Sequence, residues 1–211
     1  MAYKDYVSQA QYKFLVKNAI YTFLGLVLFG STTFVFNIAI GRVYGAEFLG
    51  RVSAALSTSL FFSYFIATTF PAPTSKFISE YYGKGRMDAA TAAFITIIIY
   101  SSMLASAIFL SVLINVQKIS EMLNLDRSLF IMATPVIILY PMYRVLRQAM
   151  YGYRIVNKYF IVETISCSLF FIILFTTISL DAKYLIFLPF IISYTLFVFI
   201  SSFFIISNIN F

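Results

Sequence analysis

The sequence contains no histidine and only one cysteine, Cys167, and both shortages exclude classes of functional site. Without histidine the chain lacks the commonest general base and the commonest metal ligand. A single thiol excludes an intramolecular disulfide framework and a thiolate metal site. We therefore predict no metal centre and no cofactor.

Charge is also scarce, at 11% of residues, and the patterns typical of enzymes are missing. The eight Asp and Glu residues are scattered, so no pair of aspartates is placed to hold Mg²⁺ near a pyrophosphate. No glycine-rich phosphate loop follows a strand, and no nucleophile elbow is present. The sequence predicts a protein that is not an enzyme.

Apolar residues, in contrast, make up 61% of the chain, and the mean hydropathy of +0.90 excludes a water-soluble domain. The apolar runs are continuous rather than alternating, which favours helices over the strands of a membrane barrel. A membrane-spanning helix needs about 20 apolar residues. We predict an all-α, polytopic bundle over residues 19–211, with six spans at about 19–41, 52–80, 89–116, 128–151, 160–180 and 184–206.

The net charge of +7 is informative through its position in the chain, and we do not interpret it as a nucleic-acid signal. If the N-terminus is cytoplasmic, ten basic residues are inside and five outside, so the positive-inside rule places both termini in the cytoplasm. The inside set is Lys4, Lys13, Lys17, Lys76, Lys84, Arg86, Arg144, Arg147, Arg154 and Lys158, and the outside set is Arg42, Arg51, Lys118, Arg127 and Lys183.

Residues 1–18 precede the first span and have amphipathic character. Tyr3, Val7, Ala10 and Phe14 share one face of a helix, and the lysines lie mostly elsewhere. This pattern indicates a short interfacial helix on the inner leaflet. A flexible tail with topogenic lysines is an equally good interpretation.

The densest set of chemically useful residues lies at the end of the fourth apolar run. Tyr140, Arg144, Arg147, Tyr151 and Arg154 follow one another at alternating spacings of four and three residues, which places them in a helical stripe about 80° wide. An arginine costs about 3 kcal/mol at the centre of a span, a cost that is easier to explain if the stripe faces a wet cavity. Guanidinium groups suit phosphate, and tyrosine rings suit sugars. The alternative is that the arginines extend to the headgroups and only set topology.

Two further polar groups are candidates for a gate or a cavity lining. Lys76 and Glu80 lie one turn apart at the inner end of the second span, where they could pair with each other or with the arginine stripe, or form a solvated helix end. Asn37 in the first span is a candidate for a cavity lining, or for an ordinary hydrogen bond to a neighbouring helix.

Glu163 is the acidic residue that opens the fifth span. It could neutralise Arg154 or Lys158 as a structural pair, or carry a coupling proton.

Three segments of the chain resemble a known family. From Gly41 the chain reads GRVYGAEFLGRVSAALS, which resembles the first outer loop and second span of polysaccharide flippases. From Pro71 it reads PAPTSKFISEYYGKGR, which is similar to the second-span exit and basic glycine turn of those proteins. From Arg147 it reads RQAMYGYRIVNKYFIVE, which looks like their connection between spans four and five. The chain thus resembles the lipid-linked oligosaccharide (O-antigen type) transporters of the multidrug/oligosaccharidyl-lipid/polysaccharide flippase superfamily.

The resemblance implies a MATE-like transporter that moves a polyprenyl-pyrophosphate-linked glycan across the cytoplasmic membrane. It implies alternating access between two bundles of about six helices, and a cationic cavity in which Arg144 and Arg147 receive the headgroup. This chain matches the first bundle only. The alternatives are a missing C-terminal half, a homodimer, or a non-transporting remnant.

Two other functions stay open. A drug/cation antiporter of the same superfamily needs buried carboxylates, and we expect no Asp or Glu at any span centre. A non-transporting scaffold subunit would instead associate stably with a partner protein.

Overall fold

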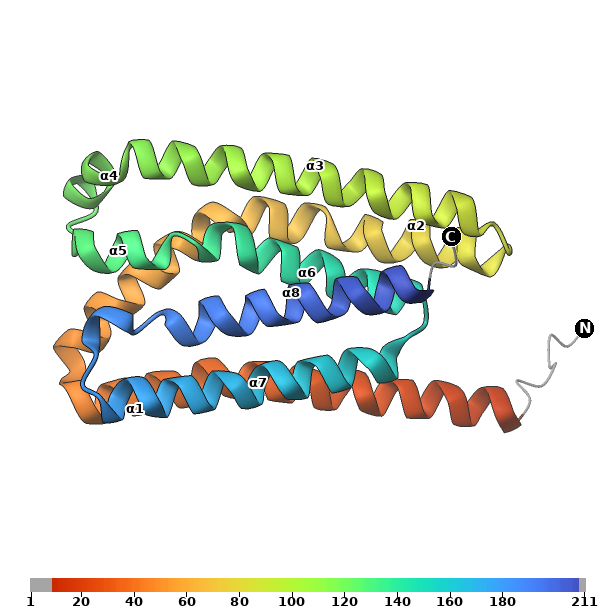
Figure 1. The fold of residues 1–211 in the computed structure, drawn as a ribbon, viewed down its shortest axis with the longest axis horizontal. Helices are drawn as coiled ribbons and strands as arrows, with labels where there is room; N and C mark the ends of the chain where they lie inside the picture. Colours follow the sequence, from red (N-terminus) through yellow and green to blue (C-terminus); the bar gives the residue numbers. More distant parts are fainter. Residues whose placement is uncertain (1–8, 209–211) are drawn as a thin grey trace, which may run out of the picture.

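The computed structural model describes residues 9–208, and the regular elements in that range are all helices (Figure 1). This confirms the prediction of an all-helical membrane bundle. The elements are α1 (Gln9–Thr69), α2 (Pro71–Gly83), α3 (Met87–Ile114), α4 (Val116–Met122), α5 (Arg127–Ala133), α6 (Val136–Gly152), α7 (Val156–Ser179), the 3-10 helix η1 (Lys183–Leu185) and α8 (Leu188–Asn208).

Among the described residues, five segments are long and apolar enough to cross a membrane, and the first contains a sharp break. This segment, Leu15–Gly83, has 69 residues. As a straight helix it would measure about 100 Å, whereas a bilayer core is about 30 Å thick. The break is at Gly45, where φ is 85° and ψ is 167°, a region that only glycine enters readily. In Figure 1, α1 turns back at the end of the molecule opposite the N-terminus. A one-residue turn therefore replaces most of the loop expected between the first two spans.

The prolines mostly begin helices instead of bending them. Pro71 is the first residue of α2, Pro135 caps α6, and Pro189 lies in the first turn of α8. Proline is tolerated at these positions because the first backbone N–H groups of a helix have no intrahelical acceptor. Pro141 is different, since it lies inside α6, one residue after Tyr140.

The helix α6 lies at the centre of the bundle and carries the arginines predicted to bind substrate. It packs against α1, α2, α3 and α8, and Figure 1 shows it between the α2–α3 side and the α7–α1 side. The approach to α2 is close, because a Cβ atom on Gly152 would lie 2.7 Å from the Cβ atom of Ile78. Buried residues such as Val145, Leu146 and Ala149 hold α6 in this position.

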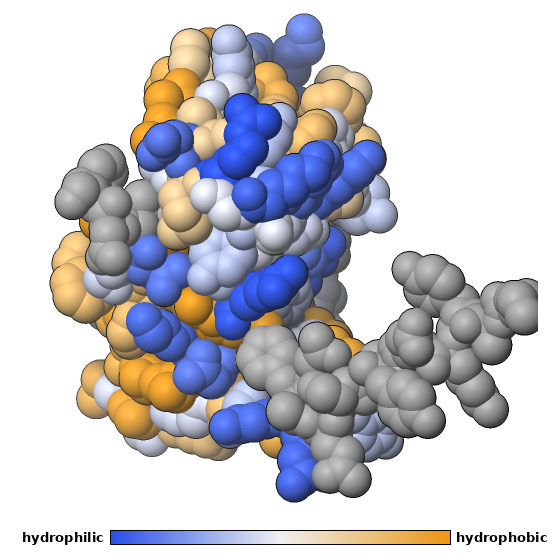
Figure 2. All heavy atoms as spheres, turned by 90° about the vertical axis from the view of Figure 1, so that its right-hand side faces the viewer, coloured by the Kyte–Doolittle hydropathy of each residue, from blue (hydrophilic) through white to orange (hydrophobic). Residues whose placement is uncertain are grey.

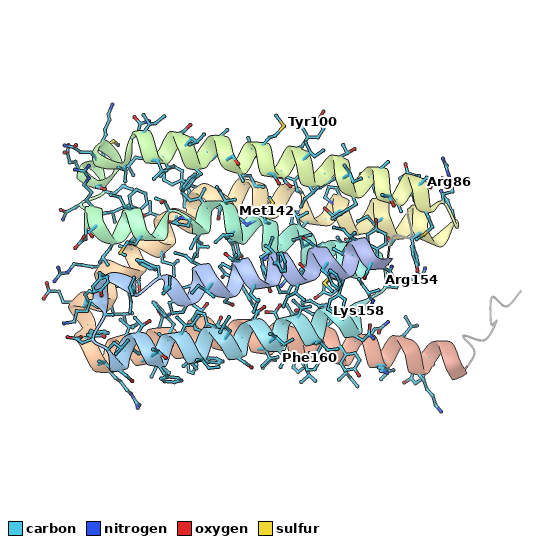
Figure 3. All side chains as sticks on the ribbon, viewed as in Figure 1. Arg86, Tyr100, Met142, Arg154, Lys158 and Phe160 are labelled. Atoms are coloured by element: carbon cyan, nitrogen blue, oxygen red, sulfur yellow. The ribbon has the colours of Figure 1, made fainter. Side chains whose placement is uncertain are left out.

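Polar and apolar surfaces separate along the length of the bundle. Hydrophilic side chains gather over the end where α2 meets α3 and α6 meets α7 (Figure 2). Figure 3 places Arg86, Arg154 and Lys158 toward this end. The sides of the bundle expose large apolar residues, such as Phe61 and Phe199, each 75% exposed. Such a surface suits the hydrocarbon interior of a membrane.

The boundary expected at residue 18, between an interfacial segment and the first span, does not coincide with a break in α1. From Gln9, α1 continues without interruption into the first span. Residues 1–8, which include Tyr3 and Val7 of the expected interfacial segment, lie outside the described residues. The interfacial helix therefore stays a prediction.

Candidate functional site

The first half of the predicted stripe forms a linked pair on α6. The Nη1 atom of Arg144 donates to the Tyr140 hydroxyl at 3.4 Å, and the guanidinium carbon lies 5.9 Å from the centroid of the Tyr140 ring. Both residues are half-buried. The Nε atom of Arg144 is buried and has no hydrogen-bond partner among the described residues. Arg144 therefore has donor capacity left for a ligand.

One turn further along α6, a chain of hydrogen bonds joins a buried arginine to a buried carboxylate. The Nη1 atom of Arg147 donates to the Tyr143 hydroxyl at 3.3 Å. That hydroxyl donates to the carboxylate oxygens of Glu163 on α7, at 3.1 and 3.2 Å. Arg147 is 6% exposed and Glu163 is 1% exposed. Tyr143 thus bridges the two charges, and we call this set the Arg147–Tyr143–Glu163 relay.

Helical spacing explains how the sequence assembles the relay. Arg147 follows Tyr143 by four residues, and Cys167 follows Glu163 by four, so each pair lies on one helix face. The thiol of Cys167 donates to Glu163 at 3.7 Å. With Tyr143 and Cys167 both donating, Glu163 acts as a hydrogen-bond acceptor for both groups.

Aromatic rings from other helices surround the relay. Phe29 of α1 stacks on Tyr143 with centroids 5.1 Å apart, and Phe197 of α8 meets Tyr143 edge-on at 4.5 Å. The guanidinium carbon of Arg147 lies 6.0 Å from the Phe29 centroid. Four helices therefore build the site, and its apolar walls strengthen every electrostatic interaction inside.

The balance of charge in this region is positive. Arg144 and Arg147 supply two guanidinium groups, and Glu163 supplies one buried carboxylate. The Nε atom of Arg147, like that of Arg144, is buried and without a partner among the described residues. A cationic site with free N–H donors suits an anion. In residues 9–208 no group of three His, Cys, Asp or Glu side chains could hold a metal ion.

The stripe does not extend to Arg154 as the spacing predicts. α6 ends at Gly152, and Arg154 has a positive φ of 59° in the turn that follows. Its exposed side chain lies beside Gly83 at the end of α2. Tyr151 stays on the helix, where its ring meets Tyr159 of α7 edge-on at 5.1 Å. Arg154 is therefore separated from the other stripe residues.

The predicted ion pair of Glu163 with Arg154 or Lys158 is also wrong, because Glu163 accepts hydrogen bonds from Tyr143 and Cys167 instead. Neither Arg154 nor Lys158 forms an ion pair with Glu163 within the part of the chain that the structure describes. Arg154 is exposed beyond the end of α6, whereas Glu163 lies about two turns inside α7 and faces α6.

The structure places the remaining candidates on exposed surfaces. Glu80 pairs with Lys84 at 2.6 Å, one turn further along the helix, instead of with Lys76. Lys76 and Glu80 are both exposed and lie apart from the arginine stripe. Asn37 is exposed as well, because its neighbours Phe36 and Ile40 occupy the buried face of α1. An inner gate at Lys76 and a cavity lining at Asn37 therefore have no support in the geometry.

Tyr143, Phe29 and the link between Cys167 and Glu163 were not predicted from the sequence. Tyr143 lies about 20° beyond the edge of the stripe, at about 60° from Tyr140 around the helix. Its four-residue spacing to Arg147 was a usable signal. The contact of Phe29 with Arg147 joins α1 to α6 and had no local signal.

A comparison with protein families identifies the chain. A family model named MatE matches residues 22–178, well over half of the sequence. The chain belongs to the MatE family. MatE proteins are membrane transporters of the multidrug/oligosaccharidyl-lipid/polysaccharide superfamily rather than enzymes, so the chain is a multi-pass membrane protein of a transporter family. This confirms the resemblance at the level of the superfamily. No curated protein and no solved structure matches the chain.

The MatE match contains the relay and both arginines of α6. It begins in α1 before Phe29 and ends in α7 after Cys167. Helix α8, which contributes Phe197 to the wall, lies beyond the matched residues.

Proposed function

We propose that this MatE protein moves a polyprenyl-pyrophosphate-linked oligosaccharide across the cytoplasmic membrane, for surface polysaccharide biosynthesis. The observation that carries the proposal is the pair of guanidinium groups inside a membrane-spanning segment, each with a buried Nε atom that lacks a partner. A pyrophosphate offers several acceptor oxygens and negative charge, which matches these donors.

The depth of the arginines supports a functional role over a purely topological one. Gly152 ends α6, so Arg147 and Arg144 lie five and eight residues inside it, about 8 and 12 Å along the axis. A headgroup-seeking arginine extends outward, yet Arg147 is 6% exposed and packs against Phe29. Ionisable residues at such positions usually mark a substrate or ion path.

The same proposal includes the orientation of the bundle in the membrane and a second bundle as its partner. Both termini lie in the cytoplasm, so the hydrophilic end in Figure 2 faces the side on which a lipid-linked precursor is assembled. Arg144 then lies within reach of a headgroup that enters from the inner leaflet. A second bundle, from a C-terminal half or from a second copy in a homodimer, completes the path for alternating access.

A drug/cation antiporter is the second candidate function, and one observation favours it. Glu163, about two turns inside α7, is a carboxylate that is buried within a span. Tyrosine rings lie near it, and the rings of Tyr143 and Tyr194 are tilted by 36° with their centroids 5.4 Å apart. Aromatic faces and a buried carboxylate are the features that attract an organic cation. The positive balance of the whole site places this candidate second.

Flipping in reconstituted liposomes tests the proposal. The assay follows a fluorescent polyprenyl-pyrophosphate-linked oligosaccharide from one leaflet to the other by its accessibility to a membrane-impermeant quencher. Arg144→Gln removes one charge and its donors, and Arg147→Lys keeps the charge but removes the planar fork. Arg86→Gln is the matched control, because Arg86 is an exposed arginine at the α2–α3 turn.

We expect both site variants to bind geranyl pyrophosphate, a short-tailed headgroup probe, about 10-fold to 100-fold more weakly, since a charged hydrogen bond contributes about 1.5–3 kcal/mol. Flipping by these variants should fall in parallel, with Arg86→Gln unchanged. Unchanged binding and flipping in Arg144→Gln would contradict the proposal. Efflux of a cationic dye that Glu163→Gln abolishes would favour the antiporter instead.

A further inference from the structure

Three grooves adjoin one another along the returning half of α1. The first lies between α1 and α6, with a volume of about 560 Å³, and includes Tyr140 in its wall. The second, about 490 Å³, lies between α1 and α4. The third, about 500 Å³, runs between α1 and the far half of α3. Each falls in the range of about 300–1,000 Å³ that is usual for ligand sites.

Shared residues connect the three grooves into one track. Ser57 and Phe61 line both the first and the second groove. Phe62 and Ile119 line both the second and the third. We call the combined feature the α1 track. It passes from the middle of the bundle to the end that carries α4.

The α1 track begins next to the proposed headgroup site. The Tyr140 ring lines its first groove, and the hydroxyl of the same residue accepts the hydrogen bond from Arg144. A ligand whose anionic group contacts Arg144 therefore has an apolar channel immediately beside it. Arg144 has a buried Nε atom without a partner, so a charged group is favoured at this end of the track.

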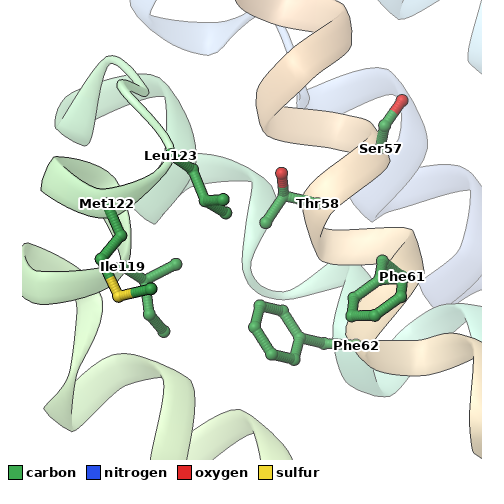
Figure 4. A pocket seen from close by; sticks show the side chains of 7 residues that line it. All are labelled: Ser57, Thr58, Phe61, Phe62, Ile119, Met122 and Leu123. Atoms are coloured by element: carbon green, nitrogen blue, oxygen red, sulfur yellow. The ribbon is translucent and has the colours of Figure 1, made fainter.

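The lining of the α1 track is apolar throughout, apart from hydroxyl and amide groups. None of the residues that line its three grooves carries a charge. A separate groove on α1, by contrast, is lined by Lys13 and Lys17. In Figure 4, the side chains of Ile119 and Met122 on α4, and of Leu123 just after it, face Phe61 and Phe62 on α1 across the second groove. Such walls fit a flexible hydrocarbon chain and exclude a sugar.

We propose that the α1 track holds the isoprenoid tail of the lipid-linked anion whose pyrophosphate binds at Arg144. This inference rests on the proposed function and adds a place for the tail. The hydrophobic effect does not favour the track over the bilayer, because lipid is equally apolar. The tail is instead directed to the track by its covalent link to the headgroup, because this link raises the local concentration of the tail once the headgroup is bound.

Site-specific photocrosslinking distinguishes this tail site from general contact with lipid. The photoreactive residue p-benzoylphenylalanine replaces Phe61 in the track, or Phe199 on α8 as the control. These positions are matched, since both are phenylalanines that are 75% exposed. The protein is reconstituted in phospholipid nanodiscs with a tagged long-chain polyprenyl pyrophosphate, and the tagged adduct is quantified at each position. Geranyl pyrophosphate binding, measured separately, reports on the headgroup site alone.

We expect about tenfold more tagged adduct at position 61 than at position 199, because the tethered tail reaches only the track. In an Arg144→Gln background, the yield at position 61 should fall to that at position 199. Equal yields at the two positions, adducts with phospholipid only, or labelling at position 61 that persists without Arg144 would each overturn the inference. If geranyl pyrophosphate binds through Arg144 in those cases, the proposed function survives. A failure of geranyl pyrophosphate to bind would remove the proposed function, and this inference with it.

Discussion

The relay predicts that Arg147 and Glu163 are energetically coupled although they form no direct ion pair among the described residues. Tyr143 accepts from one and donates to the other, at 3.3 and 3.1 Å. Removing one charge leaves the other buried without compensation, whereas removing both leaves only apolar and neutral polar groups. We therefore expect Arg147→Met to destabilise the protein strongly and Glu163→Gln to restore part of the loss.

The structure sets the expected size of this coupling. Breaking a buried charge pair by removal of one partner costs about 3–5 kcal/mol. Ordinary hydrogen bonds between membrane helices average only about 0.6 kcal/mol, with a maximum of about 1.7. Both bonds of Tyr143 have a charged partner, and bonds of this kind contribute about 1.5–3 kcal/mol each. We expect a coupling free energy of about 1.5–3 kcal/mol between Arg147 and Glu163.

A double-mutant cycle measures this coupling free energy. Unfolding of the wild-type protein, the two single variants and the double variant is followed by far-UV circular dichroism in mixed micelles with increasing denaturing detergent. The same cycle in a Tyr143→Phe background removes the bridge, and the coupling should then fall below the average for a membrane hydrogen bond. The exposed pair Glu80 and Lys84 serves as a control cycle with no measurable coupling. A coupling between Arg147 and Glu163 that is no larger than this control, or one that Tyr143→Phe leaves intact, would refute the relay.

Two glycines give further predictions, each with a glycine of α1 as its control. Gly45→Ala should lower the free energy of unfolding by about 1–3 kcal/mol, because alanine is strained at φ 85°, ψ 167°. Gly50→Ala on the same helix meets no atom within 4 Å and should be neutral or stabilising. Gly152→Ala should cost about 1–3 kcal/mol, because its Cβ atom would lie 2.7 Å from Ile78 of α2. Gly30→Ala is the control for that contact, with open space at its Cβ position. Detergent unfolding measures all four, and equal effects at Gly45 and Gly50, or at Gly152 and Gly30, would show these explanations to be wrong.

The membrane-spanning helices follow from the sequence because continuous apolar runs have one stable form in lipid. The turn at Gly45 was harder to predict. Acidic, basic and glycine residues between Gly41 and Arg51 are typical of a loop, yet the chain is helical on both sides of one glycine. A single residue with a left-handed φ leaves no pattern in its neighbours. Sequence periodicity therefore predicts that the chain reverses here without predicting how tightly.

The site shows the same limit at the level of side chains. Periodicity on one helix correctly groups Tyr140 with Arg144, because residues four apart lie on one face. It extends the group to Arg154, since nothing in the spacing shows that α6 ends at Gly152. Periodicity does not predict the relay at all, because Glu163 contacts Tyr143 only through the packing of α7 against α6. Contacts between helices depend on how each helix is rotated in the bundle, and a single sequence does not contain that information.

The relay also gives the two arginines different roles in headgroup binding. Arg147 is 6% exposed and is held by Tyr143, which in turn is fixed by Glu163, so part of its charge is already compensated. Arg144 is half-buried, donates a hydrogen bond to the neutral hydroxyl of Tyr140, and adjoins the α1 track through the same residue. A headgroup that enters the bundle therefore meets an uncompensated guanidinium at Arg144 first. Arg147 acts behind it as a fixed positive charge whose position depends on Glu163. On this argument, Glu163→Gln should weaken headgroup binding less than Arg144→Gln does, even though Glu163 is the more deeply buried residue.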